Sequence, residues 1–144
     1  MQYQIIEAKS LEEIQQVFQI RIEVFVDEQK CLPSEEFDEL DAEARHFLLF
    51  VEGAPAATGR FRKTDKGIKI ERIATLSKYR GKKLATYIIQ HIIKVAKEQF
   101  PEINYFYLHS QQTVMPLYAS LGFKPYGNTF IEADIVHQAM ECVF

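Results

Sequence analysis

The sequence lacks the features that mark several large classes of protein. Its two cysteines, Cys31 and Cys142, are too few and too far apart to predict a disulfide framework or a metal site. The longest apolar run, residues 47–51, falls far short of the ~20 residues that a membrane span needs. With 17 Lys and Arg against 20 Asp and Glu, the net charge is −3. This acidic balance argues against nucleic acid as the main partner. We therefore expect no metal, no membrane and no nucleic-acid partner.

Signals of division within the chain are also missing. No repeat, low-complexity tract or flexible linker interrupts the 144 residues, so we expect a single domain over 1–144. Residues 1–4 have neither the basic nor the apolar region of a signal peptide, which leads us to expect a cytoplasmic protein.

Strand and helix patterns alternate along the chain, which predicts an α/β fold with a mixed sheet. The expected strands are 3–8, 46–52, a second one ending at 62, 68–75, 104–109 and one or two more before 144. The expected helices begin after Ser10 and cover about 82–99 and 113–121. Ser10 and Glu13 form a capping-box pattern. The first helix carries an apolar stripe of Leu11, Ile14, Phe18, Ile22 and Phe25. Residues 30–44 contain Pro33 and six acids, which predicts a long exposed connection.

The strand 68–75 has an irregular apolar pattern. Ile68 and Ile70 set one alternation, whereas Ile73 falls one position out of phase. A β-bulge near Glu71 and Arg72 explains the slip, since one extra residue moves every later side chain to the other face. A strand that simply frays at its end is the alternative.

A basic turn opens the helix expected over 82–99. Four cations between Lys78 and Lys83 crowd a helix start, where unpaired N–H groups and the helix dipole already favour anions. An anionic phosphate ligand or a solvated basic turn both account for this cluster.

Several motifs together resemble the GNAT N-acetyltransferase superfamily. Residues 70–89 are similar to its acetyl-coenzyme A motif, a strand followed by Arg/Gln-x-x-Gly-x-Gly/Ala at the start of a helix. Arg80 and Ala85 match the ends of that motif, while Lys83 stands where the first Gly is usual. A Lys in an ordinary helical conformation still offers its amide to a phosphate. Residues 114–123 resemble the second family motif, and segments 21–29, 41–46, 110–111 and 130–140 resemble the ElaA/YjcF-like branch.

The resemblance implies a GNAT-like, mostly antiparallel central sheet flanked by helices, with a bulged, splayed central strand. It also implies acetyl transfer from acetyl-CoA to an amine by direct attack, with no metal. The implied cofactor-binding residues are Ile73, Ala74, Thr75, Arg80, Gly81, Lys82, Lys83, Leu84, Ala85 and Gln111.

The catalytic groups are fewer. The motif implies that Tyr118 is the acid for the leaving thiolate, whereas its helical spacing alone favours a core residue. Glu71 and His109 are the candidate bases for the amine, and Arg72 is a candidate for acceptor binding. His46 and His137 match the branch pattern, but both are interpreted as structural histidines. Both cysteines are expected to be partly buried thiols that pack as small apolar groups. The alternative, from another enzyme class, is that Cys31 forms a nucleophilic pair with His46.

We therefore predict an N-acetyltransferase acting on a small-molecule primary amine. The alternative is a non-catalytic acyl-CoA-binding sensor, which Lys83 favours and Tyr118 disfavours. An aminosugar, a polyamine, an antibiotic amine or a protein lysine all remain open as acceptors, and the resemblance allows a homodimer. The acidic stretch 35–43 either attracts a cationic amine or is a solvated loop.

Overall fold

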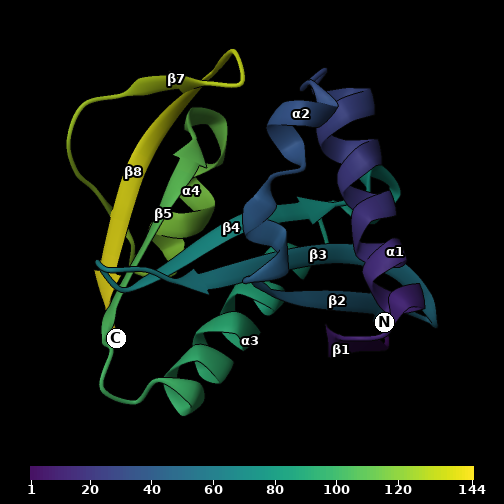
Figure 1. Ribbon diagram of the computed structural model, residues 1–144. Coiled ribbons are helices and arrows are strands. Elements are labelled where there is room, and N and C mark those ends of the chain that lie inside the picture. The colour runs from purple at the N-terminus through teal and green to yellow at the C-terminus, as the bar shows by residue number, and fades with distance from the viewer.

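The computed structural model describes residues 1–144 and contains eight strands in one sheet, with helices on both faces (Figure 1). The strands are β1 (Tyr3–Ala8), β2 (Arg45–Val51), β3 (Ala54–Lys63), β4 (Ile68–Thr75), β5 (Tyr105–Gln111), β6 (Lys124–Pro125), β7 (Phe130–Glu132) and β8 (Ile135–Val143). The helices are α1 (Leu11–Arg21), α2 (Pro33–Glu36), α3 (Leu84–Gln99) and α4 (Met115–Ser120). A π-helical segment, Ile22–Glu28, continues α1, and short 3-10 turns occupy Glu39–Ala42, Ser77–Tyr79 and Gln112–Val114. None of the helices combines the length and the apolarity that crossing a bilayer requires.

The sheet has the strand order β1-β2-β3-β4-β5-β8-β6, with β7 paired to β8. Only β4 and β5 are parallel, and every other pair is antiparallel. The α3 helix joins these two parallel strands, as a crossover of this kind requires. The predicted mixed and mostly antiparallel sheet is confirmed.

The two faces of the sheet carry separate apolar clusters. The larger one packs α3 and α4 against the sheet, and it fully buries Ile88, Ile89 and Ile92 of α3. The smaller one packs α1 and the π-helical segment against the opposite face through Val17, Ile20 and neighbouring side chains. Each such side chain contributes roughly 1.5–3 kcal/mol when it is fully buried.

The first helix begins as predicted, but its buried face differs from the expected stripe. Ser10 and Glu13 form the capping box, with the Glu13 amide donating to Ser10 Oγ at 3.1 Å. Leu11 is 76% exposed, whereas Val17 and Arg21 are buried. The apolar spacing did not reveal this because the inward face of the helix carries a charged residue, Arg21.

The predicted bulge in β4 is confirmed. Thr58 pairs with Ala74, and Arg60 pairs with Glu71, so β4 spans one more residue than β3 across the same interval. Arg72, in that interval, has a φ of 58°, which suits a bulge and is rare for a residue other than glycine. Gly59 faces the bulge, and a Cβ there would lie 2.6 Å from the end of Ile73.

The sheet splits just beyond the bulge. Parallel pairing joins Ile68–Ile70 to Phe106–Leu108 and ends there, although both strands continue. Figure 1 shows β5 and β8 diverging from β2, β3 and β4 at this point. The splayed central strand is therefore also confirmed.

Candidate functional site

A cavity of about 790 Å³ lies at the split between β4 and β5. Its walls come from β4, β5, the start of α3, α4, the π-helical segment, α2 and the β7–β8 hairpin. After the roles predicted from the sequence, we call the end near α3 and α4 the cofactor half, and the end lined by α2, β7 and the middle of β4 the acceptor half. Most of the residues predicted for the site line this cavity or the smaller pocket beside it. The exception is Lys82, which is exposed and belongs to neither.

The cofactor half ends in a small pocket of about 170 Å³ at the start of α3. Its lining includes Arg80, Gly81, Lys83, Leu84 and Ala85, so the predicted loop residues do come together. The helix begins at Leu84, two residues later than expected, because Lys83 at the N-cap takes a left-handed conformation. Its φ of 64° corrects the expectation of an ordinary helical Lys. The chain thus adopts at Lys83 the backbone geometry that a glycine adopts most easily.

Arg80 is already engaged by protein groups. Its Nη2 lies 2.9 Å from a carboxylate oxygen of Glu28, and its Nε donates to the Thr75 carbonyl at 3.1 Å. Arg80 therefore links the loop before α3 to the π-helical segment and to the end of β4.

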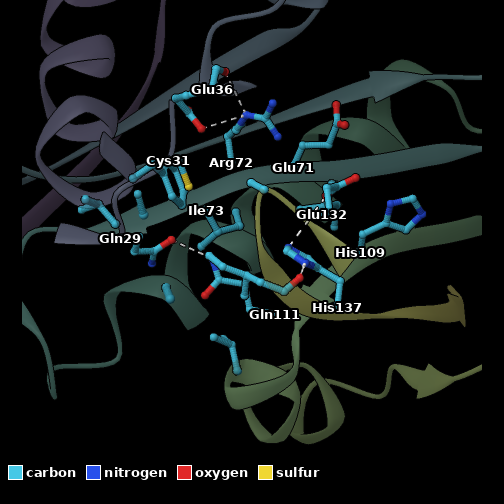
Figure 2. Close-up of a pocket in the computed structure, with 18 of the residues that line it drawn as sticks. Gln29, Cys31, Glu36, Glu71, Arg72, Ile73, His109, Gln111, Glu132 and His137 are labelled. Carbon is cyan, nitrogen blue, oxygen red and sulfur yellow. Dashed lines mark hydrogen bonds and ion pairs between the residues drawn. The ribbon is translucent and has the colours of Figure 1, made fainter. Parts of the chain in front are cut away.

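Beyond the bulge, β4 contributes Ile73, Ala74 and Thr75 to the cavity wall. The β5 side of this stretch has no strand partner, since parallel pairing ends at Ile70. Gln111, at the end of β5, donates its side-chain amide to Gln29 Oε1 at 2.8 Å. Figure 2 shows this bond crossing between the two walls.

Tyr118 serves the core and the cavity at once, so the two interpretations of this residue are compatible. Its ring packs against Phe123, and the residue is only 8% exposed, yet it lines the cavity. Burial raises the pKa of its hydroxyl, which therefore remains protonated and able to donate a hydrogen bond.

Glu71 lies in the acceptor half and is surrounded by cations. Its carboxylate contacts Arg62 Nε at 2.6 Å, Arg60 Nη2 at 3.2 Å and Lys69 Nζ at 3.3 Å. Burial favours a raised pKa, but the hydrogen bond from Arg62 and the nearby positive charges outweigh it and lower the pKa of Glu71. The carboxylate is consequently ionised and strongly held, which weakens it as a proton acceptor.

The acidic stretch 35–43 is only partly solvated: Glu35, Glu39 and Glu43 are exposed, whereas Glu36, Asp38 and Asp41 pair with arginines. The expected solvated loop is therefore corrected for these three paired acids, and attraction of a cationic amine stays a prediction. Arg21 and Arg60 are both 0% exposed and hold this stretch from below. Arg21 contacts Glu36 at 2.6 Å and Asp41 at 2.7 Å, and Arg60 contacts both oxygens of Asp38. Burial works against ionisation of Asp38, but Arg60 and its neighbours lower the pKa of Asp38 to about 2.

Arg72 extends this network from the bulge, as Figure 2 shows. Its guanidinium contacts a Glu36 carboxylate oxygen at 3.4 Å and Asp38 at 3.2 Å, and it also donates to the Glu36 carbonyl at 3.3 Å. Arg72 does line the cavity, as predicted, but it also joins β4 to the segment that walls the acceptor half.

His46, His109 and Cys31 differ in whether they line the cavity. His46 Nε2 lies 2.9 Å from the Asp41 carbonyl oxygen and lines neither pocket, as expected of a structural residue. His109 lines the cavity, and its Nδ1 is buried with no partner. Burial, aided by Lys69, lowers the pKa of His109. Cys31 also lines the cavity as a free thiol, but burial raises its pKa, which does not favour a nucleophilic thiolate paired with His46.

Other cavity residues carried no functional prediction. They include Gln29, Glu36, Glu132 and His137. The sequence gives no spacing that links them, because they come from segments far apart in the chain, although the 130–140 motif contains two of them.

The family model for the acetyltransferase (GNAT) domain matches residues 7–144. Because it covers nearly the whole chain, the protein belongs to the GNAT acetyltransferase family.

Individual relatives agree with this assignment. YjcF of Bacillus subtilis, an N-acetyltransferase by name, is 32% identical over 134 residues, which cover 92% of this chain and 94% of YjcF. Protein ElaA of Escherichia coli is 27% identical over 136 residues, covering 91% of this chain and 88% of ElaA. Among solved structures, an acyl-CoA N-acyltransferase from Pseudomonas aeruginosa has a TM-score of 0.84 at 26% identity, with 97% of each chain covered. The Escherichia coli ElaA structure gives the same TM-score and coverage at 25% identity.

Proposed function

We propose that the protein moves an acetyl group from acetyl-CoA to a primary amine of a small molecule by direct attack. The observation that carries this proposal is the continuity of the cavity. It connects the start of α3, the unpaired stretch of β4 and Tyr118 to a second half with room for an acceptor. A ternary complex needs both substrates in one space.

The residues present fit acetyl-CoA. Backbone N–H groups at the start of α3, together with Gly81 and the left-handed Lys83, suit a pyrophosphate. The β5-facing side of Ile73–Thr75 offers backbone groups to an extended amide-bearing arm. Lys82 is the one predicted phosphate-site residue outside both pockets, and it is exposed beside the loop. When bound, acetyl-CoA supplies an acetyl thioester.

Tyr118 is the proposed proton donor to the leaving thiolate. Its burial keeps the hydroxyl protonated, and the residue lines the cavity that would hold the thioester, so a proton is available there for the thiolate. An alkylammonium acceptor must first lose a proton, for which Glu71 and His109 are the acceptor-half groups predicted from the sequence.

Two measurements test the proposal in sequence. Acetyl-CoA is expected to raise the melting temperature of the wild type, because a ligand that binds only the folded state stabilises it. Ala85→Glu, which puts a carboxylate at the half-buried start of α3, is expected to abolish that increase. Ala119→Glu makes the same change at an exposed position of α4 and is expected to preserve it.

Thiol release is then followed with glucosamine, spermidine, an aminoglycoside and a lysine-containing peptide. Release that depends on one of these amines supports the transferase. Binding of acetyl-CoA with no amine-dependent release would favour the non-catalytic sensor instead. The homodimer and the cytoplasmic location stay predictions, to be checked by light scattering and by cell fractionation.

A further inference from the structure

The β7–β8 hairpin is built to aim one imidazole into the acceptor half. Ala133 and Asp134 form its two-residue turn, and their φ values of 50° and 61° are those of a type I′ turn. This turn pairs Phe130 directly with His137 and Glu132 with Ile135. Because side chains alternate along a strand, Phe130, Glu132 and His137 share one face of the hairpin.

The orientation of the His137 ring is fixed by its neighbours. The ring stacks on Phe130 with centroids 5.8 Å apart and planes 21° apart. His109 packs edge-on against the same Phe130 ring, with centroids 5.0 Å apart. His137 is buried in the cavity wall, so the stacked ring has little freedom to turn away.

Hydrogen bonding determines which nitrogen of His137 is free. Nδ1 lies 2.7 Å from the Ile135 carbonyl oxygen, so in the neutral ring Nδ1 carries the proton and donates it. The lone pair is then on Nε2. This atom lies 3.8 Å from Glu132 Oε2, which is too long for a direct hydrogen bond.

That separation suits a third group which donates to both atoms. Figure 2 shows Glu132 and His137 close together in the cavity wall. An ammonium between them can donate one N–H to His137 Nε2 and another to the Glu132 carboxylate. The side chain of Glu132 is 52% exposed and makes no other ion pair, unlike Glu71, which three cations hold. The charged or titratable groups that face His137 are Glu132 from β7 and His109 from β5.

We propose that His137 is the proton acceptor for the amine and that Glu132 is its positioning residue, roles that rest on the proposed transferase function. The proton passes from the ammonium nitrogen to His137 Nε2. The freed nitrogen lone pair forms the C–N bond to the thioester carbonyl carbon, and the C–S bond breaks. The thiolate takes a proton from Tyr118. The nitrogen loses its second proton to water as the amide forms, and water returns a proton to Tyr118. Glu132 and the Ile135 carbonyl stabilise the imidazolium until His137 also releases its proton to water.

The kinetic test uses the amine from the panel above that the wild type acetylates. His137→Gln is expected to lower kcat/KM by about 10²-fold or more, with the KM for acetyl-CoA unchanged. The acidic limb of the pH profile should disappear, and free imidazole should restore part of the activity in His137→Ala. His91→Gln, which alters a histidine on α3 outside the cavity, is expected to retain wild-type rates.

Glu132→Gln is a second test that does not depend on the His137 variants folding, because the Glu132 side chain is half exposed and its exchange should not disturb the fold. It should lower kcat/KM several-fold and shift the acidic limb to lower pH. Nitrogen NMR of the wild type should find the proton on Nδ1 of His137, and a proton on Nε2 instead would overturn the proposal.

The outcomes separate the two proposals. If His137→Gln retains full activity, or if His109→Gln alone removes the acidic limb, the role of His137 is wrong and the transferase stands. If the wild type acetylates no amine, the transferase function fails and the role of His137 fails with it.

Discussion

The two halves of the cavity are built by different means. The cofactor half is made largely of backbone: a bulge in β4, an unpaired strand segment and the start of α3. The acceptor half is made of charged side chains, with Arg21 and Arg60 buried beneath Glu36, Asp38 and Asp41. Backbone geometry suits a co-substrate that does not change, whereas a wall of side chains can be altered one residue at a time.

The two halves also affect the stability of the fold in different ways. In the cofactor half, the left-handed Lys83 adopts unfavourable backbone angles, as does Arg72 at the bulge that separates the two halves. In the acceptor half, buried charges pair with one another, and removing a shared cation such as Arg60 leaves an excess of negative charge there. Four substitutions test this contrast.

The largest expected effect is on the buried network. Arg60→Ala should lower the free energy of unfolding by about 3–5 kcal/mol, because it strands Asp38, Asp41 and Glu71 without their shared cation. Urea denaturation measures this loss. Lys63→Ala, an exposed cation on the same strand, should stay within about 0.5 kcal/mol of wild type. If the Ala variant does not fold, Arg60→Lys should give an intermediate loss of stability, since Lys keeps the charge but not the planar guanidinium that pairs with two carboxylate oxygens at once. A loss below about 1 kcal/mol for Arg60→Ala would contradict the network's role.

In the cofactor half, Tyr118→Phe should affect chemistry rather than folding. It keeps the ring that packs on Phe123 but removes the hydroxyl, so kcat should fall by about 10²-fold while acetyl-CoA affinity is unchanged. Tyr107→Phe is the matched control, since Tyr107 is buried outside the cavity with its hydroxyl against Thr64. A fully active Tyr118→Phe enzyme would show that another group protonates the thiolate.

A smaller effect is expected from acid. The pKa of Asp38 is lowered from 3.8 to about 2, so its ionised form stabilises the fold above its unfolded pKa. That contribution is lost as the pH falls from about 4 towards 2. Denaturation in urea at several pH values should give a shallower decline in this window for Asp38→Asn. Glu12→Gln, an exposed acid on α1, should decline as the wild type does.

The smallest effect is expected at the α3 N-cap. Lys83→Gly should stabilise the fold by about 1 kcal/mol, because it relieves a left-handed Lys. Lys82→Gly, next to it but without a positive φ, should stabilise nothing. Calorimetry distinguishes the two. Unchanged acetyl-CoA affinity in Lys83→Gly would assign any phosphate contact there to the backbone, and a marked drop would assign it to the Lys side chain.

The same contrast explains what the sequence could predict. The bulge was readable because Ile73 breaks the alternation set by Ile68 and Ile70. The capping box and the buried strands were likewise local patterns. The left-handed Lys83 was missed because residue type argues against that conformation, and only the surrounding fold enforces it.

The acceptor half was not predictable in this way. Arg21 lies 15 residues from Glu36, and Arg60 lies 22 from Asp38, so no local spacing links the partners. An acidic run in a sequence predicts a solvent-exposed segment, and only the fold shows that buried arginines pair with several of its carboxylates. The pairing of His137 with Glu132 was within reach, since a hairpin turn separates them, but its meaning depended on the cavity it faces.

The bulge in β4 has a consequence for how this site is inherited. The opening between β4 and β5 depends on one additional residue in a strand, and therefore on the length of the chain more than on the side chains that line the cavity. A point mutation cannot remove a residue, so substitutions can change what the cleft binds without closing it. A deletion in register with the bulge would instead remove the extra residue itself, and such deletions are rarer genetic events than exchange of an amino acid.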